Sequence, residues 1–206
     1  MANLTPLDAI CVLREGGLYD AWFPLVTASS TMQSVAPAEV FLHLDFANPP
    51  FGFMDMVLNG WGCDNLREGY FLICVRSVRQ RDAPALRFPP KPQERNLRVA
   101  IAARIQATIN ILVEPTSAGS TRCAFQIIQP IPPFVPMWIV EYALTSCMAN
   151  IFKGMAKVTQ AIADGSHASK HVQLFRSAEY RGIRSWFSER LDRYLSGLAE
   201  SKHLSQ

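Results

Sequence analysis

The chain has 206 residues, of which 49% are hydrophobic and 18% charged. That length suits one domain with a sizeable core, and the low charged fraction predicts extra apolar surface that lines a cavity, meets a partner or touches a membrane. The net charge of +3 is mild and lacks the dense basic stripe typical of nucleic-acid-binding proteins, so we expect no nucleic-acid partner.

The five cysteines are widely spaced, lie in apolar runs and form no CxxC pair. This spacing argues against a zinc site and predicts free thiols in a reducing compartment, so we expect a cytoplasmic protein, peripheral at membranes at most. The opening stretch MANLTPLDAI lacks the regions of a signal peptide. Residues 134–152 form the one transmembrane candidate, but Pro136, Glu141 and Asn150 interrupt a run that is short for a span.

The first predicted element is a helix. A hydroxyl cap followed by a proline, Thr5-Pro6, starts it, and the pair Gly16-Gly17 ends it. Residues 18–24 (LYDAWFP) then predict a short helical turn anchored by aromatic side chains.

The middle of the chain carries strand signals. The pattern changes to period two from Thr31, and residues 40–46 alternate as in a half-buried strand. A loop, 47–53 (ANPPFGF), follows. Residues 54–63 and 70–79 are β-rich runs joined by a short turn, which predicts a hairpin.

A second strand region follows a broken connection. Residues 81–96 are rich in proline and arginine, which argues against a core element there. Residues 97–113 predict one long strand or two strands. A turn at 115–120 leads to a returning strand over 121–129.

The C-terminal part is predicted to be helical. Residues 136–162 begin with a proline and are apolar over most of the helix circumference, which indicates a helix sandwiched between other elements. Residues 165–170 are a polar break, and an amphipathic helix over 178–199 follows. We therefore expect a main domain at 1–164 and a C-terminal extension at 165–206.

This order of elements resembles the START (steroidogenic acute regulatory-related lipid transfer) family. Residues 13–24 (LREGGLYDAWFP) resemble its helix and tryptophan-anchored turn, and 54–78 (MDMVLNGWGCDNLREGYFLICVRSV) its two central strands. Residues 125–157 (FQIIQPIPPFVPMWIVEYALTSCMANIFKGMAK) resemble its last strand, proline turn and C-terminal helix. The resemblance implies an α+β helix-grip fold, in which a curved antiparallel sheet packs on a long C-terminal helix, here with an extra amphipathic helix after it.

The resemblance also implies a function. The protein would bind a lipid or other hydrophobic small molecule, phospholipid or sterol-like, in an internal cavity and transfer or sense it. Loop 47–53 would be the lid, and the helix 136–160 the gate. Plant hormone receptors and aromatase/cyclase proteins are related helix-grip families.

The chain departs from the family pattern in two ways. The family's first helix and first three strands have no counterpart, which leaves the edge of strand 121–129 open to a partner, such as a second copy in a homodimer. The family's arginine–aspartate pair reads Met54-Asp55 here, so the usual polar contact for a lipid headgroup is lost.

Candidate cavity residues come from the apolar sheet face, the helix roof and a few polar positions. The apolar ones suit an ordinary packed core equally well, so cavity wall and core remain alternatives. Strand adjacency pairs Asp55 with Arg76, because a buried charge needs a partner. Phe51 and Phe53 are expected either to contact a membrane or to plug the domain. The predicted lipid-binding residues are Asp55, Asn59, Trp61, Arg76, Ile105, Ala107, Ile109, Ile111, Phe125, Ile127, Met137, Val140, Leu144 and Met148.

The sequence carries no familiar catalytic motif: GxSxG, HExxH, P-loop and GxGxxG are all missing. His167 and His171 are four residues apart but lie in a polar segment, so we expect no metal site and no cofactor. A binding protein is therefore expected, not an enzyme. Two alternatives remain: an interaction module built on a truncated START-like fold, and a cyclase-type enzyme, which would need several inward-facing acids, bases or tyrosines.

Overall fold

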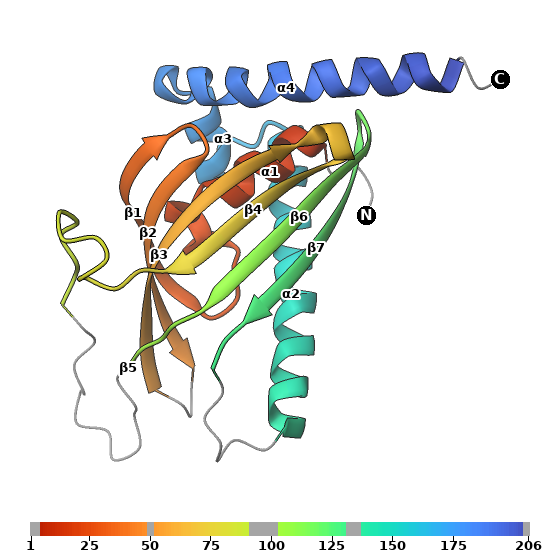
Figure 1. Ribbon diagram of the computed structural model, residues 1–206. Helices are drawn as coiled ribbons and strands as arrows, with labels where there is room; N and C mark the ends of the chain where they lie inside the picture. Colours follow the sequence, from red (N-terminus) through yellow and green to blue (C-terminus); the bar gives the residue numbers. More distant parts are fainter. Residues whose placement is uncertain (1–4, 49–51, 91–102, 131–136, 204–206) are drawn as a thin grey trace.

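A curved antiparallel sheet with helices on its concave side forms the body of the protein (Figure 1). The computed structural model describes residues 5–48, 52–90, 103–130 and 137–203. The sheet has seven strands, ordered β1-β2-β3-β4-β6-β7, with β5 paired to β3 beside this path. Helices α1 and α2 lie behind the sheet, and α4 crosses one end of it (Figure 1).

Helix α1 spans Pro6–Arg14 and begins as the sequence predicts. The Thr5 hydroxyl accepts a hydrogen bond from the Asp8 amide at 3.1 Å, which satisfies one of the free N–H groups of the first turn. The short helix η1, Gly16–Ala21, follows directly. A Cβ on Gly16 would lie 2.2 Å from a Leu42 methyl carbon, so glycine allows η1 to approach the sheet.

Strand β1, Val26–Ala36, was not delimited by the sequence analysis. Its side chains are mostly exposed and show no two-residue burial period, as suits a strand at the edge of the sheet. Strand β2, Glu39–Asn48, contains the predicted strand at 40–46.

The predicted hairpin is confirmed. Strands β3, Gly52–Asn65, and β4, Tyr70–Ser77, pair in antiparallel register and are joined by η2, Leu66–Glu68. Gly69 closes this turn at φ +96, a left-handed conformation that favours glycine.

The predicted strand region 97–113 divides in two. Strand β5 is the short segment Ala103–Arg104, which pairs in parallel with β3, and β6 is Thr108–Ser117. Residues 97–102 lie outside the described part of the chain. Strand β7, Ser120–Ile128, pairs with β6 and is the last strand on its side among the strands that the structure describes.

The C-terminal helices are α2, Met137–Ala163, α3, Lys170–Arg176, and α4, Ala178–His203. Only the second half of α2 is sandwiched, with Ile151 and Met155 buried. The prediction is wrong for the first half, where Trp138 is 69% and Tyr142 75% exposed, because no other described element covers that flank. No helix in the described ranges combines the length and hydropathy needed to cross a bilayer.

The predicted polar segment around residue 170 is partly wrong as well. His167 is exposed, but His171 lies on α3 with 1% of its surface exposed. Burial lowers the pKa of His171 to about 4, with Lys170 acting in the same direction and Asp20 against it. The two histidines therefore share a spacing without sharing an environment.

Candidate functional site

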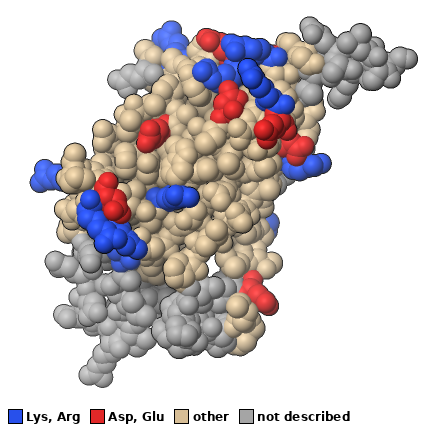
Figure 2. Space-filling view, in the orientation of Figure 1, with Lys and Arg blue, Asp and Glu red and all other residues tan. Residues whose placement is uncertain are grey.

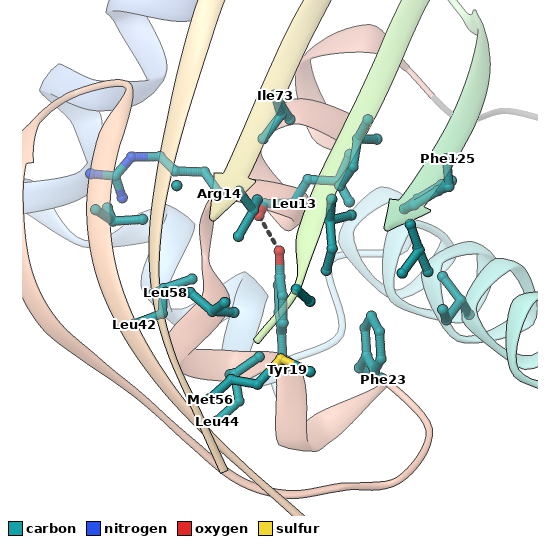
Figure 3. Close-up of a pocket in the computed structure, with 18 of the residues that line it drawn as sticks. Leu13, Arg14, Tyr19, Phe23, Leu42, Leu44, Met56, Leu58, Ile73 and Phe125 are labelled. Atoms are coloured by element: carbon teal, nitrogen blue, oxygen red, sulfur yellow. Dashed lines mark hydrogen bonds between the residues drawn. The ribbon is translucent and has the colours of Figure 1, made fainter. Parts of the chain in front are cut away.

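A cavity of about 500 Å³ lies between the concave face of the sheet and helices α1, α2 and α4. Strand alternation builds its wall, because every second side chain of a strand faces the same side. Strand β2 supplies Val40, Leu42 and Leu44, and β3 supplies Met56 and Leu58. Figure 3 shows these side chains converging on one space with residues of α1, η1, β4 and β7.

The apolar sheet residues predicted from the sequence do line this cavity. They alternate on β6, β7 and the segment before β6, so the predicted two-residue period places them on one face. Their role in holding a ligand stays a prediction. The predicted residues found in the lining are Trp61, Ile105, Ala107, Ile109, Ile111, Phe125, Ile127 and Leu144.

The three predicted polar positions, Asp55, Asn59 and Arg76, do not line the cavity. Met54 and Met56 do, so the strand alternation turns Asp55 to the outer face of the sheet. The period was right, but the sequence does not say which face is concave. The outer face is mostly uncharged between α4 and the β5 side in Figure 2.

The predicted pairing of Asp55 with Arg76 is also wrong. Asp55, which is fully buried, accepts two hydrogen bonds from Nε of Arg104, each at 3.0 Å, and lies 3.1 Å from Nε2 of His43. Nη2 of Arg104 also donates to the Pro89 carbonyl at 3.0 Å. This cluster fixes β5 beside β3, which is a structural role.

The cluster offers three possible metal ligands, since atoms of His43, Asp45 and Asp55 all lie within 4.8 Å of one another. Arg104 already compensates the charge of Asp55 through both of its carboxylate oxygens. A cation would have to displace that guanidinium, so the donor set favours the ion pair over a metal site.

The other polar candidates have partners on the outer face. The guanidinium carbon of Arg76 lies 5.7 Å from the Trp61 ring centroid, a cation–π contact. Asn59 donates from Nδ2 to Oε1 of Glu39 at 3.3 Å.

The predicted helix and loop positions have mixed outcomes. Met137 is 63% exposed and lies outside the lining. Met148 packs on the core but does not line the cavity either. The side chain of Val140 lies outside the described part of the structure, as do Phe51 and the side chain of Phe53.

Sequence reasoning missed the deep end of the cavity. Ile10 and Leu13 of α1, Tyr19 of η1 and Phe187 of α4 all line it. The alternation at 40–46 could have added the β2 residues, but no local signal places helix residues against a distant sheet. The tertiary arrangement alone brings these helices together.

The polar groups of the lining are already bonded or lie at the rim. The Tyr19 hydroxyl donates to the Leu13 carbonyl, and burial raises the pKa of Tyr19, so it stays neutral (Figure 3). The Arg14 guanidinium pairs with Glu15 and donates to the Pro37 carbonyl at 2.5 Å. Among the described lining residues, no acid and base converge on a common point, so the arrangement suits binding better than proton transfer.

The cysteines do not add a reactive group to the cavity. All five are free. Burial raises the pKa of Cys11 to about 12 and that of Cys123 to about 11, and it also raises the pKa of Cys147, which lines the cavity. A raised pKa keeps the thiol protonated and weakly nucleophilic, as the sequence predicts for apolar surroundings.

The rim of the cavity lies at the other end from α4. Leu25, which is 47% exposed, and Leu144, which is 46% exposed, line it together with Gln129. Leu25 has φ +70, a left-handed conformation that a leucine adopts only when its surroundings hold it there.

Several solved structures are similar to this chain. A STAR-related lipid transfer protein from Xanthomonas axonopodis matches with a TM-score of 0.60 and 17% identity, over 77% of this chain and 81% of that one. Human StAR-related lipid transfer protein 5 matches with 0.59 and 15%, over 79% and 73%. The Zhui aromatase/cyclase from a Streptomyces species matches with 0.51 and 9%, over 79% and 92%. No family model and no curated protein matches the sequence.

At such identities the matches show the fold alone. The curved antiparallel sheet and the helices after it agree with the architecture expected from the sequence. The chain therefore has the helix-grip fold of the START lipid-transfer domains, and the predicted fold class is confirmed.

Proposed function

We propose that this protein binds one lipid or other hydrophobic small molecule in the cavity and transfers or senses it. The observation that carries the proposal is a hollow of about 500 Å³ whose wall is almost entirely apolar. Moving apolar carbon from water into such a space is favourable by about 0.8 kcal/mol per methylene. The lipid-transfer proteins of the same fold support this reading.

The cavity volume narrows the ligand class. A dry cavity of about 150 Å³ accommodates benzene, so 500 Å³ has room for on the order of 20 non-hydrogen atoms. That size suits a single acyl chain or a compact ring system better than a phospholipid with two chains. Because the deep wall offers no free polar partner, the polar end of the ligand stays at the rim, near Gln129.

An aromatase/cyclase of the same fold raises the alternative of an enzyme. Such chemistry needs acids or bases that face the bound molecule. In the lining that the structure describes, Arg14 is paired with Glu15, and the Tyr19 hydroxyl is bonded to a backbone carbonyl. We therefore favour binding without catalysis.

Native mass spectrometry of the purified protein tests the proposal. We expect a co-purifying hydrophobic molecule that Ala107→Phe expels, because Ala107 lines the cavity and is 7% exposed. Ala124→Phe is the matched control, since Ala124 is exposed and absent from the lining. A wild-type protein that carries and binds no hydrophobic molecule would contradict the proposal.

A second candidate is an interaction module, favoured by apolar surface at the rim end. Ile128 of β7 is 55% exposed, beside an edge that no described strand pairs, and Trp138 and Tyr142 of α2 are exposed as well. Homodimers pairing through β7, or transient contact with a membrane surface, would cover this area. Light scattering distinguishes a dimer from a monomer, and co-sedimentation with vesicles tests membrane contact; loss of either on Trp138→Ser would support this candidate.

A further inference from the structure

We propose that helix α4 sets the length of the ligand, with the ring of Phe187 as the end wall of the cavity. This inference rests on the proposed binding function and adds a determinant of ligand size. It assigns a role to the C-terminal extension, which follows the long helix α2.

The position of Phe187 carries the argument. Its side chain lines the cavity, and the residue is only 2% exposed although α4 crosses the outside of the fold (Figure 1). The ring meets Phe71 of β4 edge to face, with the centroids 5.7 Å apart. Phe71 also lines the cavity and is 2% exposed, so the two rings together close this end.

Two ion pairs hold α4 against the body on either side of Phe187. Nη2 of Arg184 lies 3.2 Å from Oδ1 of Asp8 on α1, and Nε of Arg190 lies 3.5 Å from Oδ2 of Asp64 at the end of β3. Leu191, one turn further along α4, is 3% exposed. A helix fixed to two other elements holds the Phe187 ring at a defined depth.

The strand register gives the depth of the cavity. Phe71 pairs with Val113, which pairs with Cys123 of β7. Gln129, at the rim, is six residues beyond Cys123, and six residues of extended strand span about 20 Å. The cavity is thus a tube with one apolar closed end, so a chain that enters apolar end first stops at Phe187.

This geometry predicts a break in the dependence of affinity on chain length. Each added methylene should strengthen binding about fourfold while it enters the cavity. Once the chain reaches Phe187, a further methylene stays in water at the rim and adds no affinity. Removal of the ring opens a space of about 150 Å³, and after partial collapse the break should move to chains longer by about two to four carbons.

The experiment is a competition assay with saturated fatty acids from decanoic to docosanoic acid, which displace a fluorescent fatty acid. Phe187→Ala is expected to move the break to longer chains, and Phe187→Leu, which keeps the fold with less change, to move it less. Trp186→Ala is the matched control: its ring contacts that of Phe187 at 4.9 Å, but Trp186 does not line the cavity.

Each outcome decides the inference. A break that moves in both Phe187 variants but not in Trp186→Ala supports it. An unchanged break in the folded Phe187→Leu protein, or an equal shift in Trp186→Ala, overturns it and leaves the binding function standing. A wild-type protein that binds none of these acids and carries no other hydrophobic molecule overturns both.

Discussion

The two halves of helix α2 have similar apolar composition and opposite environments. Met155, in the second half, is fully buried, whereas Met137, in the first turn, is 63% exposed. The second half packs at the closed end of the cavity with α1 and α3, and the first half borders the rim. The comparison teaches that an apolar stripe marks a surface that needs covering, and that only the surrounding elements decide whether it becomes core or remains a contact surface.

The same substitution in the two halves should have very different effects. Met155→Ala removes a fully buried side chain and is expected to lower the free energy of unfolding by about 3 kcal/mol through lost burial and a residual cavity. Met137→Ala should change it by less than about 0.5 kcal/mol. Urea denaturation of both variants measures the difference, and equal losses would show that the exposed half is covered in solution.

The buried His171 predicts a pH dependence at the closed end. Its pKa is lowered to about 4 in the folded protein, while in the unfolded chain it has its ordinary value of about 6.5. As the pH falls from 6.5 to 4, the unfolded state gains a proton that the folded state does not bind, so stability should fall by about 2–3 kcal/mol.

A variant separates this effect from the titration of carboxylates. His171→Phe should flatten the stability profile between pH 6.5 and 4, measured by urea denaturation at each pH. His167→Phe, at an exposed position nearby, should leave the profile as in the wild type. If both variants keep the slope, His171 is not its source.

Two helix glycines should respond with opposite signs to alanine. A Cβ on Gly154 of α2 would lie 2.3 Å from the Trp22 carbonyl oxygen, so Gly154→Ala should cost about 2 kcal/mol despite its better helix propensity. Gly182 of α4 has open space around it, and Gly182→Ala should stabilise by about 0.5–1 kcal/mol. Thermal unfolding measures both, and a neutral Gly154→Ala would mean that α2 lies further from η1 than the structure shows.

The smallest expected effect lies at the rim. Leu25 has φ +70, and glycine relieves the strain of that conformation, so Leu25→Gly should stabilise by about 0.5 kcal/mol after the lost apolar contact is subtracted. Val35, similarly exposed at 51% but within strand β1, is the control. Val35→Gly should destabilise by about 1 kcal/mol, and destabilisation by both variants would argue against strain at Leu25.

The local elements and the fold class could be read from the sequence. The cap at Thr5, the hairpin turn at Gly69 and the alternation that puts Ile105, Ala107 and Ile109 on one face are short-range features, and the structure contains them all. The apolar part of the site followed from the same alternation. Its polar part did not, because a period of two shows which side chains share a face but not which face is concave.

Only the tertiary structure decided the remaining features. Arg104 finds Asp55 across 49 residues of chain, α3 buries His171, and α4 brings Phe187 to the end of the cavity. These contacts depend on how separate elements pack, and neither propensity nor periodicity encodes the distance between residues far apart in the chain. The sequence by itself thus determined the strands, the helices and their apolar faces, whereas packing determined which of those faces enclose a space and where that space ends.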